Sequence, residues 1–369
     1  MKILHVITTI NRGGAENYLA DLTVAQVKNG HKVMIAYLKG DGYWAGFLEG
    51  NGISVQYLKM KYHGDLIPLL KLGKIIITWK PDIIHAHMPP AEMYASIVKL
   101  CICRKKTLII SKHNIERFCT GVLNNHLFNF TNSVSDKYIA ISNAVEAYLK
   151  SLKVKEKKIK TIYYGIDTSR FTIERNDNLR ADWGISKETL LFGTVCRLMP
   201  QKAVDQLLKG YAAFRDENKV DTKLCIVGSG AIEGELKKLA VELKISPYIV
   251  WAGQRADIPE IMQSFDLFLL SSIYEGFGLV LIEAMASSLP VIATNVCSIP
   301  EIVSNDKTGI LVEPNNPAEI ATAMKRLLNK DLRKQFGDNG FKRVQDIFSI
   351  KKMVDLTEEV YSQVFTCVE

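Results

Sequence analysis

The sequence predicts an α/β protein built from two doubly wound parallel sheets. Three observations support this prediction. Short apolar runs of strand length alternate with amphipathic helical patterns along the chain. A polar run at residues 172–182 interrupts the alternation, which then begins again. The length of 369 residues is typical of two domains of ordinary size.

The first half contains seven apolar runs that predict strands. They lie at residues 2–8, 33–37, 54–58, 83–86, 107–111, 138–141 and 159–164. The first run leads through a loop into an amphipathic helix at residues 15–28, which Gly30 ends. Because ligands of a parallel sheet bind beyond the carboxyl ends of its strands, the residues after each run are the candidates for function.

The second half repeats the pattern. Strands are predicted at residues 190–196, 223–227, 248–252 and 267–270, and further strands follow Pro290 and Gly309. Helices are predicted at residues 203–216, 279–287, 317–328, 332–348 and 350–365, in addition to one at residues 144–153 in the first half. The polar run at residues 172–182 is expected to link the two domains.

The composition, 47% hydrophobic and 23% charged, is that of a globular protein. No apolar run approaches the ~20 residues that span a bilayer. The first ten residues, MKILHVITTI, read as a strand rather than as a signal peptide, since no small-residue cleavage site follows. Seven cysteines without a CxxC pair favour reduced thiols and a cytoplasmic location.

The net charge of +8 is compatible with nucleic acid, an anionic membrane or an acidic substrate as partner. The basic residues cluster at 104–106 and at 150–160, without the interleaved aromatic stripe of single-strand binders. An anionic membrane surface or a phosphorylated lipid is therefore the better interpretation. Solvated lysine-rich faces explain the same clusters equally well.

The most informative stretch is residues 265–294. An apolar strand leads into a turn that contains Gly276, Phe277 and Gly278, and a helix begins at Leu279. Free N–H groups at such a helix start form an anion site. Glu275 precedes the helix, and Glu283, inside it, leans back toward the same end. This combination of amides and carboxylates suits a nucleotide sugar, although an ordinary strand–helix turn is the alternative.

Two further turns join a strand to a helix. After the first strand, Gly13 and Gly14 precede Glu16 in the sequence NRGGAE, which lacks the GxGxxG of a dinucleotide-dependent oxidoreductase. In the second half, Arg197 and Lys202 follow the strand at 190–196. An arginine fork and a lysine point charge suit a diphosphate, and two solvated loop cations are the alternative.

Histidines follow two strands of the first half. His85 and His87 have the spacing of a metal pair, but we expect no cysteine, aspartate or third histidine to complete it. We therefore expect His85 to be structural and His87 to lie at the strand end, facing a cleft. His113 can hydrogen-bond a sugar hydroxyl or shuttle a proton, and Asn114 follows it. A satisfied loop histidine is the alternative for His113.

The stretch EGFGLVLIEAMA, residues 275–286, resembles the signature of glycosyltransferase family 4, a group of retaining GT-B enzymes. The resemblance implies two Rossmann-like domains that face each other across a cleft. Residues 1–170 would bind the acceptor and residues 171–349 the nucleotide-sugar donor, with the helix at 350–369 packing back on the first domain. Two departures are Tyr164, where the family usually has Asn, and Ala203, where it usually has Gly.

The resemblance also assigns roles to residues. Glu275 would contact the donor sugar, Glu283 the ribose, and the turn amides the sugar and phosphates. The donor-binding residues would be Gly13, Gly14, Arg197, Lys202, Arg255, Glu275, Gly276, Phe277, Gly278, Leu279 and Glu283. The catalytic residues would be His113, Glu275, Arg197 and Lys202, and the acceptor-side residues Glu16, His87 and Asn114.

The implied reaction moves a hexose-type sugar, with UDP as the expected nucleotide, to a lipid-linked or lipopolysaccharide glycan in surface polysaccharide synthesis. The chain contains no Asp-x-Asp pair, so a protein clamp is expected in place of a metal cofactor. We expect a cytoplasmic protein, peripheral on the inner membrane face, without a nucleic-acid partner. The alternatives are a nucleotide-sugar epimerase of the same fold and a basic nucleic-acid-binding protein.

Overall fold

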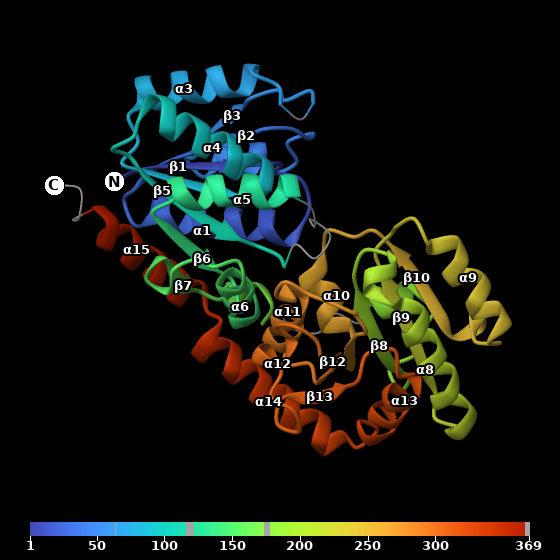
Figure 1. Ribbon diagram of the computed structural model, residues 1–369. Helices are drawn as coiled ribbons and strands as arrows, with labels where there is room; N and C mark the ends of the chain where they lie inside the picture. The colour runs from blue at the N-terminus through green and yellow to red at the C-terminus, as the bar shows by residue number, and fades with distance from the viewer. Residues whose placement is uncertain (63, 116–121, 173–177, 366–369) are drawn as a thin grey trace. The chain divides into compact units, whose positions relative to one another are not determined.

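The computed structural model describes residues 1–62, 64–115, 122–172 and 178–365. The chain forms two compact units (Figure 1). The first unit comprises Met1–Gly165 together with Ile350–Glu369, and the second comprises Ile166–Ser349. The chain therefore passes between the units twice, once after Gly165 and once after Ser349.

Within its described residues, the first unit forms a seven-stranded parallel sheet in the order β3-β2-β1-β4-β5-β6-β7. The strands are β1 (Lys2–Ile7), β2 (Lys32–Tyr37), β3 (Ser54–Tyr57), β4 (Ile83–His87), β5 (Thr107–Lys112), β6 (Lys137–Ala140) and β7 (Ile159–Thr161). The helices are α1 (Gly14–Lys28), α2 (Ala45–Gly50), α3 (Ile67–Trp79), α4 (Pro89–Ile102), α5 (Val122–Val134), α6 (Asn143–Ser151) and α15 (Ile350–Phe365).

The second unit forms a six-stranded parallel sheet in the order β10-β9-β8-β11-β12-β13. Its strands are β8 (Leu190–Val195), β9 (Thr222–Val227), β10 (Ile249–Gly253), β11 (Leu267–Leu270), β12 (Val291–Thr294) and β13 (Gly309–Val312). The helices are α7 (Asn178–Asp182), α8 (Val204–Glu217), α9 (Glu233–Glu242), α10 (Ile258–Ser264), α11 (Leu279–Ala286), α12 (Ile299–Ile302), α13 (Pro317–Arg326) and α14 (Lys330–Ile347). The predicted fold class, two doubly wound parallel sheets, is confirmed.

The central strands are buried on both faces, as parallel sheets usually are. β5 and β11 are buried along their whole lengths. In the first unit, the parallel pairing of β1 with β4 sets His5 beside His85 and Ile7 beside His87. This register brings side chains that are about 80 residues apart in the sequence into one layer of the core.

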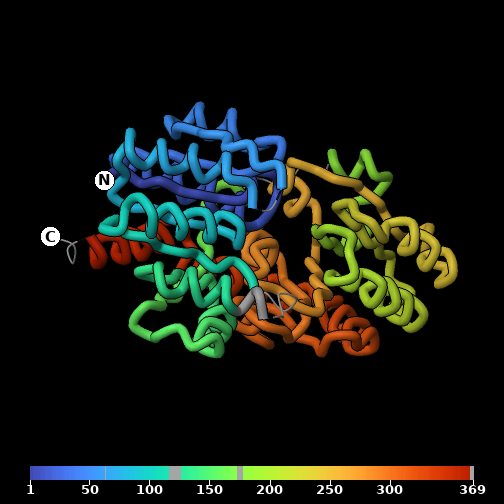
Figure 2. The backbone as a smooth tube through the Cα atoms, turned by 45° about the horizontal axis from the view of Figure 1, so that its top comes forward, coloured from blue at the N-terminus to red at the C-terminus, as the bar shows by residue number. Residues whose placement is uncertain are grey.

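The C-terminal helix α15, which is red in Figure 2, belongs to the first unit, where it packs beside α1. Inside this contact, the Gln26 amide nitrogen donates a hydrogen bond to the Tyr361 hydroxyl, with 3.3 Å between the two atoms. Both side chains are fully buried. In the part of the chain that the structure describes, no helix is long and apolar enough to cross a membrane.

The prediction that residues 172–182 link the two units is wrong for residues 178–182, which form α7 in the second unit. Arg180 explains the difference, because its guanidinium is buried and needs acceptors. It donates to the Ser264 and Ser186 carbonyls at 3.0 Å each and pairs with Asp266 at 3.0 Å. Residues 173–177 lie outside the described residues.

Candidate active site

The turn between β8 and α8 presents two cations at the carboxyl edge of the second sheet. Arg197 follows the strand and is exposed, and no ion pair of its guanidinium occurs among the described residues. Lys202 ends a short 3-10 turn, Pro200–Lys202. The next residue, Ala203, has a φ of 47°, in the left-handed region that favours glycine, which accounts for the glycine that the family usually has there.

The turn between β11 and α11 brings a carboxylate to the same edge, because β8 and β11 are neighbours in the sheet. Glu275 is buried and pairs with the Lys202 ammonium. The Ser272 hydroxyl donates to the same Glu275 oxygen at 2.7 Å. The predicted Lys202 and Glu275 thus lie together, although 73 residues separate them in the sequence.

The backbone of this second turn is held from both sides. Gly278 has a φ of 94°, a conformation that L side chains rarely adopt, and it precedes the first residue of α11, Leu279. The Ser298 hydroxyl donates to the Phe277 carbonyl at 3.0 Å. Phe277 itself is buried. The N–H groups at the start of α11 are therefore fixed in position, as an anion site requires.

The other predicted donor residues of the second unit lie nearby or are already engaged. Glu283 lies inside α11 and is half-buried. Arg255 follows β10, and its fork binds both carboxylate oxygens of Asp257, at 2.8 and 2.5 Å. This pair lowers the pKa of Asp257. The Arg255 fork is thus paired with Asp257, and its contact with the donor stays a prediction.

In the first unit, the start of α1 is covered by a carboxylate. Gly13 precedes the helix, and a Cβ atom added there would lie 2.4 Å from Glu16 Oε2. The Thr9 hydroxyl donates to the other Glu16 oxygen at 2.6 Å. Glu16 thus folds back over the helix start, beside the predicted Gly13 and Gly14.

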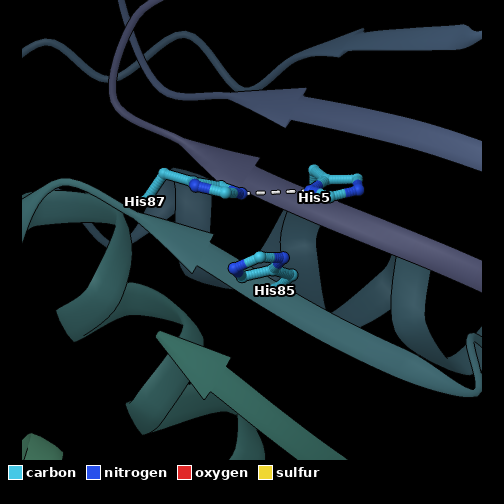
Figure 3. A group of neighbouring side chains, drawn as sticks. All are labelled: His5, His85 and His87. Carbon is cyan, nitrogen blue, oxygen red and sulfur yellow. Dashed lines mark hydrogen bonds between the residues drawn. The ribbon is translucent and has the colours of Figure 1, made fainter. Parts of the chain in front are cut away.

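The expectation that no third histidine accompanies His85 and His87 is wrong. His5 on β1 lies with them, and all three side chains are fully buried (Figure 3). The His5 and His87 rings are joined by a hydrogen bond, with 3.0 Å between Nδ1 of His5 and Nε2 of His87. The third histidine escapes sequence reasoning because it comes from a neighbouring strand.

The burial of His87 changes its expected role, because the sequence predicted that His87 lies at a strand end on the acceptor side. His87 has no exposed surface, and its Nδ1 bonds Nε2 of His113 at 3.0 Å. Any effect of His87 on an acceptor therefore passes through His113. His113 is half-buried and Asn114 is exposed. These two residues, which follow β5, are therefore accessible to a ligand, whereas His87 at the end of β4 is not.

Burial keeps the histidines of this group neutral. It lowers the pKa of His5 to about 4 and the pKa of His113 to about 3. It also lowers the pKa of His85 and His87 well below 6.5, and the neighbouring histidines add to the effect. The Tyr164 hydroxyl contacts His113 Nδ1, and burial raises its pKa well above 10. At neutral pH, all these groups are uncharged.

Comparison with known families identifies the chain. The family described as Glycosyltransferase Family 4 matches residues 12–170, and the family described as Glycosyl transferases group 1 matches residues 175–343. The chain therefore belongs to the group 1/family 4 glycosyltransferases, and it is an enzyme of that class. This confirms the predicted family.

Curated relatives agree with this assignment. The chain is 28% identical over 305 residues to N-acetyl-alpha-D-glucosaminyl L-malate synthase of Bacillus anthracis, covering 81% of this chain and 79% of the relative. It is 25% identical over 307 residues to the UDP-Gal:alpha-D-GlcNAc-diphosphoundecaprenol alpha-1,3-galactosyltransferase of Escherichia coli, covering 80% and 79%. It is also 25% identical, over 81% of each chain, to the capsular polysaccharide biosynthesis glycosyltransferase CapM of Staphylococcus aureus.

A solved structure supports the fold. HepE of Anabaena, crystallised in complex with UDP and glucose, superposes with a TM-score of 0.88 at 23% identity, covering 98% of this chain and 100% of HepE. This likeness confirms the predicted GT-B fold.

Several residues that the structure shows bonded to the predicted site residues were not predicted from the sequence. Ser272 and Ser298 hold the turn that carries Glu275, and Gln26 and Tyr361 bond the histidine group. A signal exists for Gln26, which falls on the apolar face of the predicted helix four residues after Leu22. A polar side chain on a buried helix face needs a partner, so it marks a hydrogen-bond network.

Proposed function

We propose that this glycosyltransferase moves a hexose-type sugar, with retention of configuration, from a UDP-sugar to a lipid-linked or lipopolysaccharide glycan in surface polysaccharide synthesis. The pairing of Lys202 with Glu275, beside the N-terminus of α11, is the observation that supports it best. This edge of the second sheet combines a half-buried cation, a buried carboxylate and the backbone amides at the start of α11, which are the groups that a sugar diphosphate needs.

The chemistry follows from these groups. Negative charge collects on the diphosphate as the bond to the sugar breaks, and Lys202, Arg197 and the α11 amides are suited to stabilise it. In the absence of the donor, Lys202 is neutralised by Glu275. A bound diphosphate would compete for the ammonium and free the Glu275 carboxylate to accept hydrogen bonds from sugar hydroxyls. Glu283, within α11, is proposed to hold the ribose.

The choice of UDP rests on the relatives, because the Escherichia coli relative is named for a UDP-Gal donor and a diphosphoundecaprenol acceptor. The relatives are named for different sugars and acceptors, so the proposal concerns the class of UDP-hexoses. The role of residues 1–170 in binding the acceptor is part of this proposal.

Thermal stabilisation by nucleotides tests the donor. A ligand that binds only the folded state raises the melting temperature by mass action. We expect UDP and a UDP-sugar to stabilise the chain, in the presence of a chelator as well as without it, and GDP and ADP to do so much less. Stabilisation by none of the three diphosphates would contradict the proposal. Conversion of UDP-GlcNAc to an epimer without acceptor would favour the epimerase.

A lipid-linked acceptor implies that the enzyme contacts a membrane surface. Helix α3 carries exposed apolar residues that suit this contact. Its outward face carries Leu66, Ile67, Leu70 and Ile77, and Leu70 is 74% exposed. Ile102 at the end of α4 is also exposed and lies over Gly73 of α3. We call these exposed apolar residues of α3 and α4 the α3 face.

The charge around the α3 face selects an anionic lipid surface. Residues 59–80 contain five lysines and one acid, Asp65, whose buried carboxylate accepts from the backbone N–H groups of Lys61 and Ile67. The basic cluster at 104–106 directly follows α4. Each buried leucine contributes ~1.5–3 kcal/mol, and each cation near such a surface ~1 kcal/mol.

The second basic cluster, at 150–160, is a weaker candidate. Lys150 pairs with Glu146 and Glu156, at 3.0 and 3.1 Å. Lys158 donates to the Asn132 and Ser135 carbonyls at 2.8 and 2.7 Å. These two lysines are engaged within the chain, so the α3 face is the proposed contact.

Vesicle flotation tests the α3 face. The full chain should float with vesicles that contain phosphatidylglycerol and should not float with phosphatidylcholine alone. Leu70→Gln with Ile77→Gln should lower binding at least tenfold, about 1.4 kcal/mol. Val241→Gln is the matched control, since Val241 is 65% exposed on α9 of the second unit. Equal flotation of both variants would contradict the proposal, as would self-association through the α3 face in light scattering.

A further inference from the structure

A continuous chain of hydrogen bonds crosses the first unit from α1 to the loop after β7. It begins at the Gln26 Oε1 atom, which lies 2.9 Å from His5 Nε2. His5 Nδ1 bonds His87 Nε2 at 3.0 Å, and His87 Nδ1 bonds His113 Nε2 at 3.0 Å. The chain ends where His113 Nδ1 meets the Tyr164 hydroxyl. Both ring nitrogens of each histidine are thus engaged.

The direction of these bonds follows from elementary donor and acceptor rules. An amide oxygen only accepts, so His5 must donate from Nε2. A neutral imidazole carries one proton, so His5 Nδ1 accepts from His87 Nε2–H. The same step repeated makes His87 accept from His113 Nε2–H and makes His113 accept from the Tyr164 hydroxyl. One amide therefore determines the tautomer of all three rings.

A second branch leaves the same amide in the other direction. The Gln26 nitrogen donates to the Tyr361 oxygen, and the Tyr361 hydroxyl lies 2.6 Å from His85 Nδ1. His85 Nε2 lies 2.7 Å from the Ser111 hydroxyl. Tyr361 donates to His85, and His85 then donates from Nε2 to Ser111. This branch gives His85 the same tautomer, but it does not lead to His113.

We propose that Gln26 is a positioning residue that holds His5, His87, His113 and His85 in one shared tautomer, with the proton on Nε2. Turning the amide by 180° would reverse every bond and move all four protons to Nδ1. Mixed states would set two donors or two acceptors against each other inside the core, which is costly. The described orientation, with the amide nitrogen toward Tyr361, selects the Nε2–H set.

The consequence for the site concerns what His113 can do, and this step rests on the proposed function. The Nε2–H group of His113 bonds His87, so a ligand that bonds this ring must do so at Nδ1, in place of the Tyr164 hydroxyl. Nδ1 can accept a hydrogen bond and cannot donate one. The Tyr164 hydroxyl occupies it now, and a sugar hydroxyl has the chemistry to replace that hydroxyl. His113 is thereby set to recognise a hydroxyl as donor.

A metal centre is the competing interpretation of His5, His85 and His87, whose ligand atoms all lie within 4.8 Å of one another. The hydrogen bonds argue against it, because all six ring nitrogens already have partners. A zinc site would need at least three of these bonds to break. The shared-tautomer network accounts for every nitrogen without a further group.

Nitrogen NMR tests the proposal directly. In the full chain labelled with 15N-histidine, two-bond proton–nitrogen correlations at pH 7.5 report which ring nitrogen carries the proton. We expect His5, His85, His87 and His113 all to be neutral Nε2–H tautomers. Different tautomers among His5, His87 and His113, or charged rings, would overturn the proposal. So would about one equivalent of zinc in the purified chain that is lost in His85→Asn.

Two variants separate positioning from packing. Gln26→Met removes the amide that both branches share, whereas Ser111→Ala removes a buried partner from the branch that does not reach His113. Both should lose stability, and Gln26→Met should lose more, because the Gln26 amide makes two buried hydrogen bonds whereas Ser111 bonds His85 once. Only Gln26→Met should change the His113 nitrogen signals, and it should slow UDP release from a UDP-sugar about tenfold, the worth of one hydrogen bond.

The two readouts keep this inference apart from the proposed function. The tautomers are measured without any donor, so a chain that releases no UDP would contradict the proposed function and leave the tautomer result standing. Unchanged His113 signals in Gln26→Met would overturn the positioning role. A loss of UDP release in Ser111→Ala equal to that in Gln26→Met would assign the effect to packing and would overturn it too.

Discussion

At the scale of single residues, Lys202 should be the strongest determinant of diphosphate binding. Lys202→Met removes a charged partner worth about 1.5–3 kcal/mol, so the affinity for UDP should fall at least tenfold. Uridine, which lacks phosphates, should bind equally well to both proteins. Calorimetry with UDP and uridine measures the difference.

The matched control for this prediction is Lys209→Met. Lys209 is half-exposed on α8 and pairs with Asp205 at 3.1 Å, one helical turn away. Its loss should leave UDP binding unchanged. If Lys209→Met weakened UDP as much as Lys202→Met does, the effect would be one of general charge, and the clamp would be disproved.

The residue scale also shows where sequence reasoning stops. The residue types at Lys202 and Glu275 predicted a phosphate and sugar site, and the structure brings these two side chains into contact. The third histidine, His5, could not be predicted, because the register of β1 on β4 places it beside His85 and no local pattern reports that register. Similarly, nothing in the sequence shows that Arg255 is engaged by Asp257 through both oxygens.

At the scale of secondary-structure elements, the β11–α11 turn depends on the conformation of Gly278. The φ of 94° is strained for any residue with a Cβ atom. Gly278→Ala should therefore cost about 1–2 kcal/mol of unfolding free energy. The nearest atom to an added Cβ is Leu281 Cδ1 at 3.4 Å, so backbone strain rather than crowding causes the loss.

Urea denaturation measures this cost, and Gly234→Ala provides the control. Gly234 lies in α9 with an ordinary helical backbone and open space around it. Alanine there should stabilise the chain by about 0.5–1 kcal/mol. Equal effects of the two substitutions would show that the strain at Gly278 is absent.

Elements were predicted best where an apolar run has clear ends. Both ends of the strand at 267–270 were predicted correctly, since Phe265 and Asp266 precede it and a polar loop follows. The strand at 159–164 ends earlier, at Thr161, where the chain leaves the sheet edge after β7. The helix α7 was missed because it is only five residues long and its one buried side chain is an arginine, a residue type that ordinarily indicates a surface.

At the scale of the whole molecule, the histidines make the two units differ in their response to acid. All seven histidines of the sequence belong to the first unit, and none to the second. His5, His85, His87 and His113 are held neutral by burial, with lowered pKa values. In the unfolded chain they would titrate near 6.5.

The direction in which pH changes the stability follows from the number of protons that the folded and unfolded states bind. Below pH 6.5 the unfolded chain binds protons that the folded first unit does not, so unfolding is favoured as the pH falls. The stabilisation is complete above pH 6.5 and is lost progressively toward pH 4, the folded value of His5. Between pH 7.5 and 5.5 each of the four histidines should lower the free energy of unfolding by about 1.4 kcal/mol, and the four together should lower it by about 5.6 kcal/mol.

The first unit should consequently unfold before the second in mildly acidic solution. Urea denaturation at pH 7.5 and 5.5, followed by hydrogen exchange of peptides from each unit, measures the two transitions separately. Only peptides from residues 1–165 and 350–365 should lose protection at pH 5.5. His31→Asn is the control, because His31 pairs with Glu358 and lies outside the buried group, so it should leave this difference in place. Equal acid sensitivity of the two units would show that the four histidines are not buried in the neutral form, and that result would also remove the basis for a shared tautomer.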